Sequence, residues 1–157
     1  IGDWNISSVT DMSFMFTYAA FNQPIGDWDV SSVTDMTDSF YRSSFNQPIG
    51  DWDVSNVTSM FGMFYLSSFN QPIGDWDVSS VTDMAVMFFA SNSFNQDISS
   101  WDVSNVTNMR QMFYWTTDFN QDISLWSVSK VTTCSGFFEN TPNWTLPKPN
   151  FTNCSPD

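Results

Sequence analysis

The sixteen residues FNQPIGDWDVSSVTDM at positions 21–36 decide the fold, because the chain repeats them with few changes. Near-copies begin at Phe45 and Phe69, and looser copies begin at Phe94 (FNQDISSWDVSNVTNM) and Phe119 (FNQDISLWSVSKVTTC). The tryptophans set the period, with steps of 24, 24, 24, 25 and 25 residues along Trp4, Trp28, Trp52, Trp76, Trp101 and Trp126. A period of roughly 20 to 29 residues is typical of solenoids, in which each repeat stacks on its neighbours.

Two periodicities within each repeat predict one strand and one helix. Residues 25–33 (IGDWDVSSV) alternate apolar Trp28 and Val30 with polar neighbours, which predicts a short strand with one buried face. Apolar residues then recur at i, i+3 and i+4, as in Met60, Met63 and Phe64, which is helical spacing. The threonines just before this segment are the expected N-caps: Thr10, Thr34, Thr58, Thr82, Thr107 and Thr132. We therefore expect an α/β solenoid of about six stacked strand–helix rungs of 24–25 residues each.

The repeat also resembles a known family. The pattern F-N-Q-x-I-x-x-W-x-V-S-x-V-T-x-M-x-x-M-F, over residues 1 to about 145, is similar to the roughly 26-residue repeat of the BspA-like bacterial surface proteins, which are counted with leucine-rich repeats. Ile98, Trp101 and Val103 stand where L-x-x-L-x-L would, but Val106 replaces the usual ladder asparagine. A ladder is expected at another corner, from Asn22, Asn46, Asn70, Asn95 and Asn120. The resemblance implies a leucine-rich-repeat-like solenoid, surface display and adhesion-like roles, and it identifies no site residues.

Composition excludes several classes of function. Seventeen acidic against four basic residues give a net charge of −13, which argues against nucleic acid and anionic membrane surfaces as partners. No apolar run of about 18 residues is present, so no transmembrane segment is expected. The absence of histidine excludes Ser-His-Asp and Cys-His nucleophiles. A glycosidase needs one distinct carboxylate pair, whereas these aspartates recur repeat after repeat, so we expect no enzyme activity.

The two ends of the repeat array differ. After Phe138 the pattern decays into a Pro-rich stretch, so we expect repeats over 1–138 and a capping segment over 139–157. Cys134 and Cys154 are expected to form a disulfide that pins this cap and to indicate an extracellular or cell-surface location. No comparable cover precedes Ile1, so Trp4, Val9, Met12 and Phe16 are expected to lie exposed. Further repeats or another subunit are the expected protein partners at that side.

Six Asn-x-Ser/Thr sequons are candidate glycosylation sites: Asn5, Asn56, Asn105, Asn143, Asn150 and Asn153. Asn56 and Asn105 share one repeat position, so glycans on them would project from one face.

Aspartates recur at two outward positions of the predicted strands. Stacking brings equal positions about 4.8 Å apart, where carboxylates repel one another. Bound Ca²⁺ would relieve this repulsion, and the candidate ligands are Asp27, Asp29, Asp51, Asp53, Asp75, Asp77 and Asp102. The alternatives are a solvated acidic face that keeps the molecule soluble, and recognition of a cationic partner. No other cofactor is expected.

A second candidate surface is an aromatic stripe made of Tyr41, Tyr65, Phe89 and Tyr114. Each of these residues directly follows a core phenylalanine. The stripe therefore either packs within the fold, stacks on glycans or contacts a neighbouring subunit. The methionine and tryptophan columns are assigned to the core. The leading functional hypothesis is a non-catalytic, extracellular structural or adhesive module, part of a larger assembly, with a Ca²⁺- or glycan-binding module as the alternative. Ice binding is disfavoured by the charged face.

Overall fold

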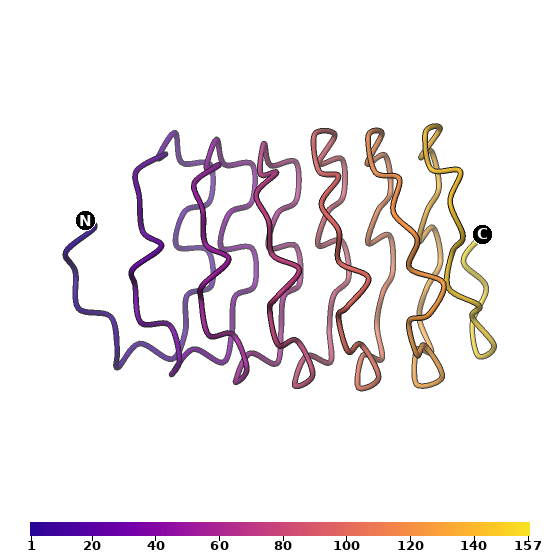
Figure 1. Cartoon of the computed structure of the whole chain (residues 1–157), viewed down its shortest axis with the longest axis horizontal. Helices are drawn as coiled ribbons and strands as arrows, with labels where there is room; N and C mark the ends of the chain where they lie inside the picture. Colours follow the sequence, from indigo (N-terminus) through magenta and orange to yellow (C-terminus); the bar gives the residue numbers. More distant parts are fainter.

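The computed structural model describes all 157 residues as a stack of repeats that follow one another along the long axis of the molecule. The two termini lie at opposite ends of the stack (Figure 1). The chain forms no α-helix and no extended strand. One residue of each repeat forms an isolated parallel bridge with the next repeat, in the pairs Asp11–Asp35, Asp35–Ser59, Ser59–Asp83, Asp83–Asn108 and Asn108–Thr133. The predicted α/β leucine-rich-repeat-like solenoid of strand–helix rungs is therefore wrong.

The segment predicted as a helix is a run of overlapping turns. The amide of Met63 donates to Met60 (N···O 3.2 Å), that of Tyr65 to Gly62 (2.9 Å) and that of Ser67 to Phe64 (3.1 Å). Gly62 and Leu66 have φ of 59° and 52°, as the third residue of a type II turn requires. An α-helix cannot contain such residues, because every helical residue has negative φ. The equivalent stretches are called the turn segments below: 12–18, 36–42, 60–66, 84–90, 109–115 and 134–140.

Alternate amides of the first five turn segments bond to the next repeat. Gly62, Phe64 and Leu66 donate to the carbonyls of Ala85, Met87 and Phe89 at 3.0, 2.9 and 2.8 Å. Successive repeats thus satisfy each other's backbone groups, which a seven-residue helix would satisfy only in part.

The threonines do not act as helix N-caps, because no helix follows them. Thr58, for example, donates from its amide (2.8 Å) and its hydroxyl (3.1 Å) to the carbonyl of Thr34 one repeat before. The threonine column therefore joins repeats to one another.

The stretch predicted as a strand has the predicted burial but not the predicted backbone. Trp76 and Val78 are buried, while Asp75 and Asp77 are exposed. The chain nevertheless turns twice here, with the amide of Trp76 donating to Ile73 (3.2 Å) and that of Val81 to Val78 (2.9 Å). These local bonds replace the inter-strand ladder that the alternation suggested.

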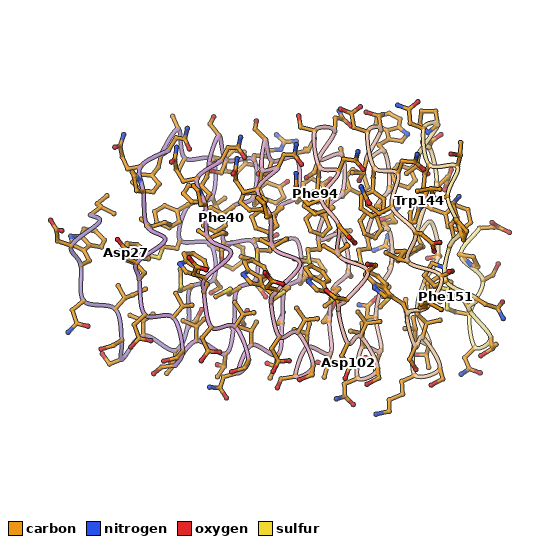
Figure 2. The ribbon with its side chains drawn as sticks, in the orientation of Figure 1. Asp27, Phe40, Phe94, Asp102, Trp144 and Phe151 are labelled. Atoms are coloured by element: carbon orange, nitrogen blue, oxygen red, sulfur yellow. A yellow bond between two sulfur atoms is a disulfide. The ribbon has the colours of Figure 1, made fainter.

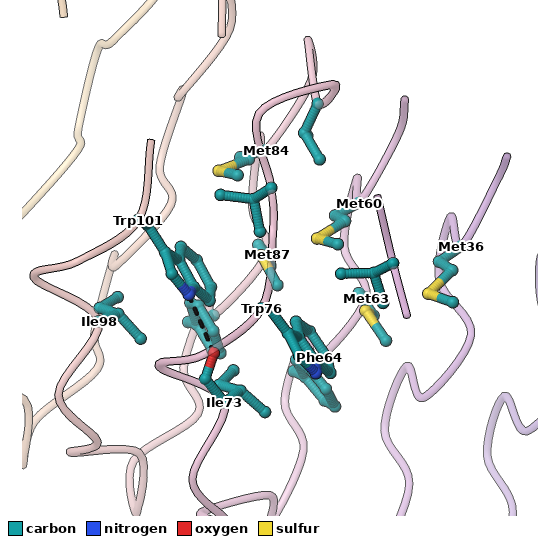
Figure 3. Packing of buried hydrophobic residues seen from close by; sticks show 14 of the residues in the cluster. Met36, Met60, Met63, Phe64, Ile73, Trp76, Met84, Met87, Ile98 and Trp101 are labelled. Carbon is teal, nitrogen blue, oxygen red and sulfur yellow. Dashed lines mark hydrogen bonds between the residues drawn. The ribbon is translucent and has the colours of Figure 1, made fainter. Parts of the chain in front are cut away.

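One continuous core of 41 buried side chains extends along the stack. Columns of Phe, Trp, Met, Val and Ile each repeat once per rung, so the methionines except Met15, and the tryptophans except Trp4 and Trp115, are core residues (Figure 3). Each core tryptophan of the repeats also donates its indole N–H to a backbone carbonyl, as Trp101 does to Ile73 (3.0 Å; Figure 3). Because a buried indole needs such a partner, this bond fixes the ring within the stack.

The asparagine ladder is confirmed. The Oδ1 atom of each ladder residue accepts the backbone N–H of the corresponding residue one repeat later, with Asn46 bonding to Asn22, Asn70 to Asn46, Asn95 to Asn70 and Asn120 to Asn95 at 2.8–3.0 Å. Asn120 bonds in the same way to Thr145, which extends the ladder into the C-terminal segment.

Candidate aromatic binding surface

The stripe of four aromatic residues forms a ladder of stacked rings. The ring centroids of Tyr41 and Tyr65 are 4.7 Å apart, those of Tyr65 and Phe89 4.6 Å, and those of Phe89 and Tyr114 4.9 Å. The interplanar angles are 14° or less. All four rings are partly exposed, because each follows a buried Phe of the turn segment and points to its outer edge. We call this set, Tyr41, Tyr65, Phe89 and Tyr114, the aromatic ladder.

The stripe meets two further exposed rings that the sequence pattern did not identify. Tyr18 packs edge-on against Tyr41 at 5.4 Å and is 65% exposed. Trp115 stacks on Tyr114 at 5.9 Å and is 53% exposed. Tyr18 and Trp115 each lie one residue after the repeat position that the ladder occupies. The pattern at that position alone therefore does not identify them. Clusters of large aromatic residues after a buried Phe, such as Phe113–Trp115, were the available signal.

The charge around the aromatic ladder differs from that of the whole chain. Of the seventeen acidic residues, only Asp38 and Glu139 fall within the turn segments, which also hold two of the four basic residues, Arg42 and Arg110. The Arg42 guanidinium lies 5.6 Å from the ring centre of Tyr18 and 5.7 Å from that of Tyr41. The ladder is thus an apolar, weakly charged surface on a strongly acidic molecule.

The predicted metal ligands lie exposed and form local turns. The Oδ1 of Asp29 accepts the amide (3.1 Å) and hydroxyl (2.6 Å) of Ser31, and Asp53 accepts the same two groups of Ser55. Asp77 and Asp102 accept the amides of Ser79 and Ser104 at 3.0 Å. These Asx-turns explain why Asp-x-Ser recurs at positions 29–31, 53–55, 77–79 and 102–104.

Hydrogen bonds to these carboxylates favour their charged form. The hydroxyl and then the amide of Ser31 lower the pKa of Asp29, and the same groups of Ser79 and Ser104 lower the pKa of Asp77 and Asp102. No group of three or more Asp, Glu or Cys side chains is placed to hold a metal ion. Asp27, Asp51 and Asp75 are exposed as well. Calcium binding therefore stays a prediction for which the structure assembles no ligand set.

The C-terminal segment covers the last repeat, and the predicted disulfide joins Cys134 to Cys154. Trp144 is buried against the edges of Phe113 and Phe119, at centroid distances of 5.3 and 4.7 Å. Phe151 packs edge-on against Phe137 at 4.9 Å. Figure 2 shows Trp144 and Phe151 at this end of the stack.

At the other end only part of the expected apolar edge is exposed. Trp4 is 54% exposed, although its ring stacks on Trp28 at 6.4 Å. Met12 and Phe16 are buried, and Val9 is partly buried. Interactions of this end with further repeats or subunits stay a prediction.

All six sequon asparagines are exposed. Asn56 and Asn105 donate their side-chain amides to Ser31 and Ser79 of the preceding repeat, each at 2.8 Å. Glycosylation of these sites stays a prediction.

The structure contains no helix with the length and apolar character needed to span a bilayer. The geometry defines a repeat protein that carries an aromatic ladder on its surface and a disulfide-linked cap. The family described as "Mycoplasma protein of unknown function, DUF285" matches residues 1–68 and 52–151, and the chain belongs to it. No curated protein and no solved structure shows a significant match to the chain.

Proposed function

We propose that this chain is a non-catalytic adhesive module of a cell surface or extracellular matrix, and that the aromatic ladder is its contact surface. The aromatic ladder carries the proposal, because it is a continuous, partly exposed row of rings in register along the stack. Interfaces are enriched in aromatic residues, and exposed apolar patches commonly mark interaction sites. A ladder of this kind offers many equivalent contacts, which suits adhesion better than the binding of one small substrate.

Other features support an extracellular location. A disulfide between Cys134 and Cys154 is typical of proteins in oxidising compartments. The similarity of the repeat to those of BspA-like bacterial surface proteins supports display on a cell surface. The absence of histidine and the equal surroundings of the recurring aspartates support a non-catalytic role.

Adhesion of coated microspheres tests this proposal. Microspheres that carry the chain are applied to a panel of immobilised glycoproteins and extracellular-matrix proteins, and retention is counted. The pair Tyr65→Ser and Phe89→Ser removes the centre of the ladder, where the rings are 4.6 Å apart. Because central aromatic residues dominate many interfaces, we expect retention to weaken by about tenfold or more.

The control is Phe14→Ser, which removes an exposed aromatic ring outside the ladder. Retention that is unchanged by the Tyr65/Phe89 pair, in a variant that keeps its melting temperature within a few degrees of the parent, would refute the ladder as contact surface. Failure of the parent chain to bind any member of the panel would refute adhesion. Light scattering of the parent chain and of the pair variant distinguishes self-assembly through the ladder from contact with a different partner.

A further inference from the structure

A shallow pocket, open to solvent, lies between Trp115, which stacks on the last ring of the aromatic ladder, and the C-terminal segment. Its volume is about 680 Å³, within the range of about 300 to 1,000 Å³ that is usual for small-molecule sites. Trp115 and Phe138 supply aromatic walls, and Asn92, Glu139, Asn140 and Lys148 supply polar groups. We propose that this pocket binds one neutral pyranose unit of a glycan, with the sugar ring stacked on Trp115. The inference rests on the adhesive function proposed above and names the chemical class of the partner.

Trp115 is the aromatic ring in the pocket that remains available for stacking. The Lys148 ammonium lies 4.9 Å from the ring centre of Trp144 and 5.4 Å from that of Phe138, so both rings already have a cation–π partner. Trp144 is itself buried. Trp115 is 53% exposed, and its positive φ of 58° is held by a hydrogen bond from its amide to the carbonyl of Glu139 (3.0 Å). A large exposed indole held in place by the backbone suits the apolar face of a pyranose ring.

The polar groups of the pocket match a ligand with many hydroxyls. Asn92 and Asn140 present exposed side-chain amides, each of which can donate and accept hydrogen bonds. Glu139 adds an exposed acceptor at the same rim. Sugar hydroxyls both donate and accept, so a pyranose can bond to all three groups while its ring covers Trp115.

Charge favours a neutral sugar over an acidic or basic ligand. The net charge of −13 and the carboxylate of Glu139 repel sugars that carry carboxylate or sulfate. The one ammonium in the pocket, Lys148, is already bonded to the carbonyl of Trp144 (2.9 Å) and disfavours a cationic ligand. A neutral pyranose needs no counter-charge and therefore fits this mixture of groups.

Saturation-transfer NMR with small glycosides tests the proposal. The probes are the methyl glycosides of glucose, galactose, mannose and N-acetylglucosamine, each at about 10 mM, which detects even millimolar affinity. We expect transfer to at least one of them. Trp115→Asn should weaken that transfer by about tenfold or more, because it removes the platform while asparagine tolerates positive φ. Asn140→Gly, at φ 59°, is a second variant that removes an amide without backbone strain, and it should weaken binding about threefold.

The matched control is Trp4→Asn, since Trp4 is exposed to nearly the same extent (54%) but belongs to the first repeat, far from the pocket. Its binding should equal that of the parent chain. Absence of transfer from all four glycosides, or equal transfer in the parent chain and in folded Trp115→Asn and Asn140→Gly, would overturn the proposal. If adhesion of microspheres still depends on Tyr65 and Phe89 in that case, only the sugar pocket is wrong and the adhesive function stands.

Discussion

Positive φ angles recur at two positions of each turn segment, and only two of the twelve residues involved are glycines, Gly62 and Gly136. The other ten include β-branched Val86 and bulky Leu66 and Trp115. An L-residue pays about 1 to 2 kcal/mol to adopt this conformation. The inter-repeat hydrogen bonds of the same residues, such as Leu66 to Phe89, offset that cost. Strain of this kind persists only where the surrounding stack determines the backbone.

Substitution of Gly62 by alanine tests the backbone at one such position. Gly62 has φ 59°, and an added Cβ would collide with Oδ1 of Asp38 in the preceding repeat. We expect Gly62→Ala to lower the free energy of unfolding by about 2 kcal/mol, from backbone strain and from the collision together. Urea denaturation measures this change.

Gly136→Ala is the matched control for the collision. Gly136 also has positive φ, but an added Cβ would first meet the flexible side chain of Gln111, at 3.0 Å. Its loss of stability should therefore be smaller, about 1 kcal/mol. Equal losses at the two positions would show that the contact with Asp38 is not as described.

The carboxyl group of Asp38 should make the free energy of unfolding depend on pH. Its Oδ1 is buried without a hydrogen-bond partner, and burial raises the pKa of this carboxyl above 3.8. The folded state therefore disfavours the charged carboxylate, so the Asp38 contribution to stability improves as pH falls through the raised pKa towards 3.8. We expect Asp38→Asn to be more stable than the parent chain at pH 7, with a difference that shrinks at about pH 4. Urea denaturation of both chains at the two pH values measures it, and a difference independent of pH would refute this account.

At the scale of the repeat, the sequence predicted which residues are buried but not how the backbone turns. Met60, Met63 and Phe64 are buried as the i, i+3, i+4 spacing required. The overlapping turns bury the same three residues, so this spacing fits both backbones. Glycine at 62 and 136 within the predicted helices was a signal against helix. The decisive factor was the hydrogen bonding between repeats, which no single repeat can reveal.

The candidate site could be predicted only in part for a similar reason. Repetition identified Tyr41, Tyr65, Phe89 and Tyr114, because equal positions must stack. The pocket beside Trp115 depends on how residues 141–148, which follow the last turn segment, fold back, for which the pattern gave no information. The column of aspartates left metal binding and a solvated acidic face as alternatives, because repetition alone does not reveal the hydrogen bonds that Ser31 and Ser55 donate to Asp29 and Asp53.

The tryptophan column makes a prediction at this scale. Trp76 is buried and donates its indole N–H to Ile49 of the preceding repeat (3.0 Å). Trp76→Phe removes that bond and leaves space in the core, so we expect a loss of about 2 kcal/mol in the free energy of unfolding. Trp4→Phe, at an exposed ring, should change it by less than about 0.5 kcal/mol. Similar effects at both positions would mean that the indole column does not join the repeats.

Across the whole molecule, the repeats separate an apolar ladder from acidic turns. Four of the six turn segments each place one ring of the ladder at the outer edge, while the exposed aspartates of the Asx-turns lie in the stretch around the buried tryptophan. This separation leaves one weakly charged aromatic surface on a molecule with 18% aromatic residues and a net charge of −13. Both functional proposals depend on it, since a helix in place of each turn segment would aim Tyr65 and its equivalents differently.

Scalar coupling through hydrogen bonds, measured by NMR on isotope-labelled protein, tests this arrangement most directly. The amide nitrogen of Phe64 should couple to the carbonyl carbon of Met87 in the next repeat, because the two groups are hydrogen-bonded at 2.9 Å. The equivalent couplings should join Phe40 to Met63 and Phe88 to Met112, both also at 2.9 Å. A coupling from Phe64 to Met60, four residues earlier in the same repeat, is what an α-helix would produce, and it would contradict the account.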